Sequence, residues 1–230
     1  MRIAILEAGA PPARLSRFPS YGAMTERMIG PAHACTILDV RAGQLPEDAG
    51  AFDGFAVTGS AAGVYDPLSW IAPLIGFLRA LPPDRPLVGI CFGHQVMAEA
   101  YGGRAVRSEK GRALGLHDYT ITERTPFMDD AERIAVAAFH QDQVVTAPPG
   151  ARVLAASAFT PHAMLAYRDR AALSVQFHPE FEPDYTHALI AGHAEAEVAP
   201  ERTQAALASL DAPDDRHRVG GWIRRFLDNP

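Results

Sequence analysis

Short apolar runs alternate with helical patterns through the first part of the chain. The apolar runs are RIAIL (2–6), CTILDV (35–40), FAVT (55–58) and PLVGIC (86–91). Between them, residues 21–29 and 70–81 have the apolar spacing of amphipathic helices, and Pro73 interrupts the second one early. Continuous apolar strands separated by helices are typical of a parallel sheet that is covered on both faces. The sequence therefore predicts an α/β fold with a mostly parallel central sheet and flanking helices.

The pattern changes at Gly103. From 103 to 177 the chain consists of short segments rich in strand-forming residues, which predicts additional strands, some of them in antiparallel pairs. After Pro183 helical patterns return, over 188–197, 202–210 and 221–227. We therefore expect one domain over residues 1–195, with residues 196–230 as a helical C-terminal extension of the same domain.

The composition limits the classes of partner. The chain has 230 residues, 48% of them hydrophobic, and can bury one substantial core. Its formal net charge of -6 and the absence of basic runs argue against nucleic-acid or membrane binding, so a small polar molecule or a protein is the expected partner. No apolar segment has the length of a membrane span or the form of a signal peptide, and only two cysteines, Cys35 and Cys91, are present. We expect a cytoplasmic protein without disulfides.

Cys91 lies between two glycines where the fourth apolar run ends. The spacing Gly89, Cys91, Gly93 matches the nucleophile-elbow pattern, with cysteine in the position of the serine. In open parallel sheets ligands bind beyond the carboxyl ends of the strands, where Cys91 is predicted to lie. Residues 94–101 predict a helix whose N-terminal dipole would stabilise a thiolate. The alternative is that Cys91 is a small hydrophobic residue of a core strand.

A catalytic thiol requires a base, and His178 in SVQFHPE is the best candidate. If a strand continues through this segment, His178 and Glu180 lie on the same face and can meet across Pro179. A carboxylate on one imidazole nitrogen would fix the tautomer and leave the other nitrogen to accept the proton of the thiol. The alternative is a hydrogen-bonded histidine at a strand end. Four other histidines are predicted to lie at the surface: His33, His187, His193 and His217.

Together, GICFGHQ (89–95) and QFHPE (176–180) resemble the class I, or triad, glutamine amidotransferase family, and the resemblance extends from the N-terminal strand to about Leu189. It implies that Cys91 is the nucleophile, His178 the acid and base, and Glu180 the group that orients His178. It also implies an oxyanion hole formed by the backbone N–H groups of Gly59 and Phe92.

The same resemblance implies residues that bind the substrate. They are Ser60, Gln95, His140 and Asp142. His140 and Asp142 belong to FHQDQV (139–144), which is similar to the H-x-D-x-V stretch that lines the pocket in the family; hydrogen-bonded loop residues are the alternative for both. The family chemistry needs no metal or other cofactor, and the sequence contains no cluster with metal-ligand spacing.

The implied reaction is attack of the thiolate on a γ-glutamyl amide, followed by hydrolysis of the γ-glutamyl thioester. At the oxyanion loop the chain has TGSA (58–61), where family members that serve a synthase often carry Gly-Gly-Pro. In this it looks more like stand-alone members, among them plant γ-glutamyl peptidases and uncharacterised bacterial amidotransferase-like proteins. We expect a hydrolase of glutamine or a related γ-glutamyl compound. The alternatives are a glutaminase subunit that supplies ammonia to a separate synthase, and a non-catalytic regulatory member of the fold.

Overall fold

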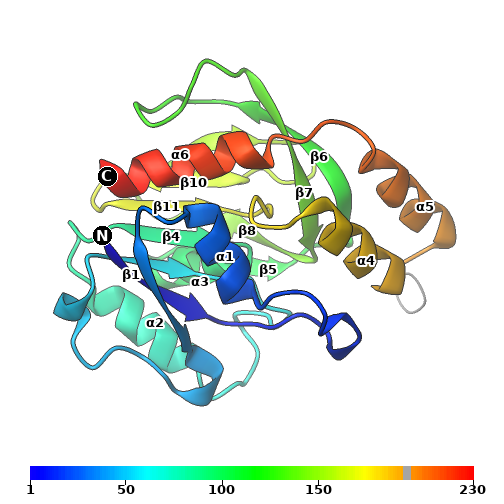
Figure 1. Ribbon diagram of the computed structural model, residues 1–230. Helices are drawn as coiled ribbons and strands as arrows, with labels where there is room; N and C mark the ends of the chain where they lie inside the picture. Colours follow the sequence, from blue (N-terminus) through cyan, green and yellow to red (C-terminus); the bar gives the residue numbers. More distant parts are fainter. Residues whose placement is uncertain (194–197) are drawn as a thin grey trace.

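The protein is described by a computed structural model that covers residues 1–193 and 198–230. In this part of the chain nine strands form a mixed sheet (Figure 1). In spatial order they are β2 (Ala34–Asp39), β1 (Arg2–Glu7), β3 (Gly54–Val57), β4 (Leu87–Ile90), β11 (Ala172–Val175), β10 (Met164–Tyr167), β9 (Ala151–Ala156), β6 (Ala113–Ile121) and β7 (Arg133–His140). From β2 to β11 all neighbours are parallel, and from β11 to β7 all are antiparallel. This confirms the predicted fold class.

A separate two-stranded antiparallel sheet is formed by β5 (Arg104–Arg107) and β8 (Asp142–Thr146). The helices of the described residues are α1 (Tyr21–Ile29), α2 (Ile71–Ala80), α3 (Phe92–Ala100), α4 (Pro183–His193), α5 (Pro200–Ser209) and α6 (Arg216–Asp228), with short 3₁₀ turns at Ala13–Leu15, Val40–Ala42 and Ala49–Ala51. The predicted helix over 188–197 corresponds to α4, which begins earlier, at Pro183. Its predicted end and the domain boundary at 195/196 lie outside the described residues.

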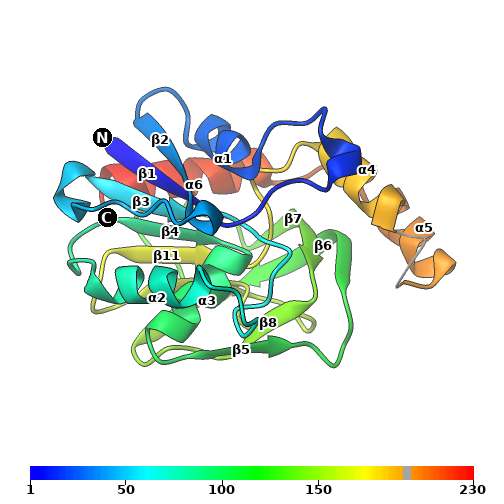
Figure 2. The ribbon, with the colours of Figure 1, turned by 90° about the horizontal axis from the view of Figure 1, so that it is seen from below.

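The central sheet is buried between two helical layers. Figure 2 shows α1 and α6 on one face and α2 and α3 on the other. Successive residues of β1 point to opposite faces, so Ile3 and Ile5 pack in the core with α1 and α6, whereas Ala4 and Leu6 pack in the core with α2 and α3. The apolar run of β1 is continuous because both of its faces are covered.

Two departures from the predicted helices have local physical reasons. Pro73 does not break α2, because it is the third residue of the helix, where backbone N–H groups have no intrahelical acceptor. The C-terminal helix was predicted over 221–227, but α6 begins at Arg216 and includes Gly220 and Gly221. Burial of Trp222 against the sheet outweighs the low helix propensity of these glycines.

The parallel strands bring distant segments to one edge of the sheet. Val57 pairs with Gly89, and Ile90 pairs with Val175, so β3, β4 and β11 end side by side. The residues that follow these strands are Thr58, Cys91 and Gln176. Three motifs that are far apart in the sequence therefore meet at the carboxyl ends of adjacent strands, where α/β sheets bind their ligands.

The first prediction concerns the packing of α3 on β3. A Cβ atom on Gly93 would overlap the backbone carbonyl of Val57, and neither backbone can easily move. We expect Gly93→Ala to lower the free energy of unfolding by about 2–4 kcal/mol. Gly76→Ala in α2 is the control, because nothing lies within 4 Å of the added atom, and it should stabilise the protein by about 0.5–1 kcal/mol. Urea denaturation followed by circular dichroism measures both, and equal stability of Gly93→Ala and the parent chain would contradict the packing argument.

Candidate functional site

Cys91 occupies a strained turn between β4 and α3. Its backbone has φ 52° and ψ -101°, and it is the only non-glycine residue with positive φ in the described part of the chain. Such a conformation persists only where the surrounding structure enforces it. Gly89 and Gly93 make the enforcement possible, because a side chain at Gly89 would overlap Met97 and one at Gly93 would overlap Val57. The turn holds Cys91, which is 5% exposed, at the wall of a cavity.

Cys91 is also the N-cap of α3, and Phe92 is the first residue of that helix. The backbone N–H groups of the first helical turn have no intrahelical acceptors, and the helix dipole places partial positive charge there. An anion or a developing negative charge next to Cys91 would therefore be stabilised. The predicted helix after Cys91 is present and begins two residues earlier than expected.

His178 and Glu180 meet in the turn that follows β11. No strand continues through them, because β11 ends at Val175 and the His178 N–H donates to the Ala137 carbonyl of β7 at 2.9 Å. The two side chains nevertheless lie together, with 2.8 Å between His178 Nδ1 and Glu180 Oε1. Both residues are buried. His178 Nε2 is also buried and makes no hydrogen bond of regular geometry to any described residue.

The charges around His178 favour its protonated form. Burial alone would lower the pKa of the ring, but the negative charge of Glu180 and then that of Cys91 raise it to about 10. Phe181 stacks on the imidazole with ring centres 4.0 Å apart and planes 9° from parallel. The ring is thus fixed on its face by Phe181 and at Nδ1 by Glu180.

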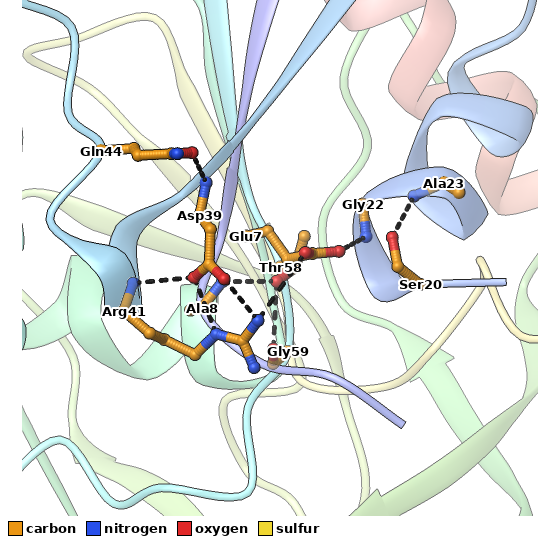
Figure 3. A network of polar contacts seen from close by, with 10 residues as sticks. All are labelled: Glu7, Ala8, Ser20, Gly22, Ala23, Asp39, Arg41, Gln44, Thr58 and Gly59. Carbon is orange, nitrogen blue, oxygen red and sulfur yellow. Dashed lines mark hydrogen bonds and ion pairs between the residues drawn. The ribbon is translucent and has the colours of Figure 1, made fainter. Parts of the chain in front are cut away.

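Gly59 lies against both side chains. A Cβ atom built on it would be 3.2 Å from His178 Cε1 and 3.7 Å from Cys91 Cβ, so the backbone of Gly59 approaches the space that these two residues border. Thr58 fixes this loop, because its hydroxyl accepts the Ala8 N–H at 3.0 Å and donates to the Gly59 carbonyl at 3.1 Å (Figure 3). The loop after β3 is thereby attached to the end of β1.

The same network holds α1 at this edge of the sheet. The Glu7 carboxylate accepts the Gly22 N–H at 2.6 Å, and the Ser20 hydroxyl caps the helix at Ala23 (Figure 3). The side chain of Tyr21 consequently reaches the cavity wall. Its hydroxyl accepts a hydrogen bond from Tyr185 at 3.1 Å, and burial raises the pKa of Tyr21 to about 12.

The cavity next to Cys91 has a volume of about 490 Å³, which is within the usual range for small-molecule sites. Its lining includes Gly59, Cys91 and His178, together with all four residues implied as substrate-binding: Ser60, Gln95, His140 and Asp142. Phe92 and Glu180 are not among the side chains that line it. The structure therefore brings the predicted residues to one place, with Glu180 behind His178.

Gln95 and His140 converge on the backbone of Asp142. The Gln95 amide donates to the Asp142 carbonyl at 3.0 Å, and His140 Nδ1 lies 3.1 Å from the same oxygen. Burial lowers the pKa of His140 to about 3, so its ring is neutral at physiological pH. The Asp142 carboxylate accepts the Tyr65 hydroxyl at 3.1 Å, and its pKa is raised, mainly by burial.

Several lining residues were not predicted from the sequence: Tyr21, Arg107, Arg112, Phe181 and His193. His193 was expected at the surface, but it lines the cavity and packs against Phe139 at 5.2 Å between ring centres. His33 was also expected at the surface and is only 8% exposed, with Nε2 3.4 Å from Asp228 of α6. The lining residues come from separate elements, among them α1, β5, β7 and α4, which only the tertiary fold brings together.

Two further properties bear on the site. The described residues contain no group of three or more His, Cys, Asp or Glu side chains arranged to hold a metal ion. None of the helices in the described ranges combines the length and the apolar character that crossing a bilayer would require.

Comparison with known proteins places the chain among amidotransferases. The sequence pattern of the family described as glutamine amidotransferase class-I matches residues 36–192. The chain is 31% identical to γ-glutamyl peptidase 4 of Arabidopsis thaliana over 151 residues, which cover 62% of the chain and 60% of that protein. It is 43% identical over 105 residues to the glutamine-hydrolysing GMP synthase of Thermus thermophilus, covering 44% of the chain and 20% of the synthase. The match to the plant peptidase thus spans about three fifths of its length.

A solved structure extends the comparison of the fold to nearly the whole chain. A glutamine amidotransferase from Thermotoga maritima superimposes with a TM-score of 0.74, covering 98% of this chain and 96% of that one at 18% identity. The fold and the match over residues 36–192 lead to one conclusion: the chain belongs to the class I glutamine amidotransferase family.

Proposed function

We propose that the protein is a cysteine hydrolase that cleaves the γ-glutamyl amide bond of glutamine or of a related γ-glutamyl compound. The observation that carries this proposal is the arrangement of Cys91, His178 and Glu180, in which a cysteine on a strained turn borders an imidazole that a buried carboxylate orients. Such an arrangement of nucleophile, base and orienting group is suited to acyl transfer.

In the first step the Cys91 thiolate attacks the side-chain carbonyl carbon of the substrate. A carbon–sulfur bond forms, and the electron pair of the carbonyl moves to its oxygen. The N–H groups of Phe92 and Gly59 are proposed to bind this oxyanion. The position of Phe92 at the start of α3 and the close approach of Gly59 to Cys91 support this role.

In the second step His178 gives its proton to the leaving nitrogen, the carbon–nitrogen bond breaks, and the γ-glutamyl thioester remains on Cys91. His178 then takes a proton from water, whose oxygen attacks the thioester, and glutamate and the Cys91 thiolate are released. The Glu180 carboxylate is proposed to stabilise the imidazolium. The raised pKa of His178 supports its role as the proton donor at neutral pH.

The substrate is proposed to occupy the 490 Å³ cavity. Ser60 and the Asp142 carboxylate are positioned to contact it, while Gln95 and His140 line the wall and hold the Asp142 backbone in place. Because the His140 ring is neutral, it can hydrogen-bond to a substrate but would not compete with His178 as the acid. No cofactor has a part in this mechanism.

A second candidate is a glutaminase subunit that delivers ammonia to a separate synthase, and the similarity to part of a GMP synthase favours it. The similarity to a γ-glutamyl peptidase covers more of the chain and favours independent action. The third possibility is a non-catalytic regulatory protein. The presence of Cys91, His178 and Glu180 together disfavours it.

Two organisational proposals accompany the function. Residues 1–195 and 196–230 are proposed to form one domain, which the packing of α5 on β6 and of α6 on α1 supports. The protein is proposed to act in the cytoplasm; its two free cysteines are compatible with a reducing compartment.

The central prediction is that the purified chain alone releases ammonia or an amine from L-glutamine or from at least one of a panel of γ-glutamyl amides and peptides. Cys91→Ala should lower kcat at least about 1000-fold, because no other group can form the thioester. Cys35→Ala is the control, since Cys35 lies on β2, away from the cavity, and it should keep the parent rate. Near-normal turnover by Cys91→Ala would rule out the mechanism. A folded parent chain without activity on any of these compounds would favour the glutaminase subunit that acts with a separate synthase.

A further prediction concerns the proton on His178. Because its pKa is about 10 in the folded chain and about 6.5 when unfolded, protonation stabilises the fold below about pH 6.5, and this contribution is lost as the pH rises towards about 10. In ¹⁵N NMR titrations the ring should remain protonated above neutral pH. Glu180→Gln should lower the pKa of His178 more than Cys91→Ala does, since the charge of Glu180 raises this pKa more than the charge of Cys91 does.

Glu182→Gln is the matched control for this titration, because Glu182 pairs with Arg216 at 3.0 Å and does not contact His178. In the same Glu180→Gln protein we expect kcat to fall by a factor of about 10³–10⁴, because no carboxylate then stabilises the imidazolium. A wild-type His178 that titrates at or below its ordinary pKa would contradict the proposed charge arrangement.

A further inference from the structure

The cavity contains a second pair of opposite charges, away from His178 and Glu180. Arg107 is the last residue of β5 and Asp142 the first of β8, and the two are direct partners in the antiparallel register. Directly opposite residues of an antiparallel pair project to the same face of the sheet. Both Arg107 and Asp142 line the cavity that contains Cys91.

These two charges do not neutralise one another in an ion pair. No nitrogen of Arg107 lies within 4.0 Å of a carboxylate oxygen among the described residues, and its guanidinium makes no hydrogen bond there. Arg107 is exposed, and Asp142 is half-buried and held by the Tyr65 hydroxyl. A fixed carboxylate and an available guanidinium therefore stand next to each other at the cavity wall.

The other arginine of the cavity is already engaged. The Arg112 guanidinium donates to Gln141 Oε1 at 2.9 Å and lies over the Phe139 ring at 5.4 Å. It contributes positive charge to this side of the cavity, as does Arg107; the pKa of Asp142, raised by burial, is lowered in part by both. Arg107 is thus the guanidinium that a ligand can contact without displacing a protein partner.

We propose that Arg107 binds a carboxylate of the substrate and thereby determines specificity; this rests on the proposed function of the same cavity. A guanidinium offers two parallel N–H donors that match a carboxylate, and Asp142 beside it matches an ammonium group. An amino-acid head carries both groups. The carboxylate has two possible sources: the α-carboxylate of the γ-glutamyl group, or the carboxylate of an amino acid that leaves as the amine.

The test measures binding, so that it does not depend on turnover. Titration calorimetry in the Cys91→Ala background gives the Kd of four ligands: L-glutamine, γ-glutamylglycine, γ-glutamyl methylamide and 4-aminobutanamide. The last ligand lacks the α-carboxylate, and only γ-glutamylglycine has a carboxylate on its leaving amine. Arg107→Gln is compared with Arg104→Gln, an exposed arginine on the same strand that does not line the cavity.

Arg107→Gln should raise Kd at least about tenfold for ligands whose carboxylate it binds, as expected for a lost charge-assisted hydrogen bond, and Arg107→Lys should recover part of the loss. Weaker binding of all ligands except 4-aminobutanamide assigns the α-carboxylate. Weaker binding of γ-glutamylglycine alone assigns the leaving group. Arg104→Gln should leave every Kd unchanged.

An unchanged Kd for all four ligands, or an equal loss that includes 4-aminobutanamide, would overturn the role of Arg107. Turnover by the chain with intact Cys91, measured in parallel with the same ligands, separates this outcome from failure of the proposed function. Turnover without dependence on Arg107 rejects only the carboxylate site. Binding that depends on Arg107 without turnover keeps the carboxylate site and rejects the hydrolase.

Discussion

The close approach of α3 to the parallel strands is the constraint on which the rest of the site depends. It requires that Gly93 touch the backbone of Val57 and that Gly89 leave space for Met97. Because the space at Gly89 and Gly93 is so restricted, the chain turns from strand to helix with a positive φ at Cys91. The strain is a local cost of about 1–3 kcal/mol, and the burial of α3 between β3, β4 and α2 offsets it. The thiol thus emerges at the sheet edge as a result of packing.

A second constraint is the burial of charge behind the thiol. Removing a carboxylate and an imidazolium from water is costly unless each has a close partner. His178 and Glu180 are two residues apart on one turn, so their contact needs little additional ordering of the chain. The stacked Phe181 and the bond from His178 N–H to Ala137 fix the turn. The Glu180 carboxylate thereby favours the protonated form of a histidine whose pKa burial alone would lower.

The sequence was informative where chemistry and local structure coincide. Cys91 was recognisable because its two flanking glycines mark the turn itself, and His178 with Glu180 because they are neighbours in the chain. Period-two reasoning brought the pair together on a strand, whereas β11 ends at Val175 and the His178 N–H donates to Ala137 of β7 instead. Arg107 could not be identified at all. Its position opposite Asp142 depends on the pairing of β5 with β8, and the two residues are separated by the whole β6–β7 hairpin.

The two pairs of opposite charge divide the cavity into parts with different tasks. The His178–Glu180 pair is buried and in contact, and the imidazole borders the same space as Cys91. Arg107 and Asp142 are nearer to solvent and unpaired with each other, so their fields are directed towards whatever enters. Charges at an exposed rim contribute more to selecting a ligand than to holding the fold together, because solvent screens them in the empty site. In the proposed mechanism the buried pair serves the chemistry at Cys91, and the rim pair serves the recognition of the substrate.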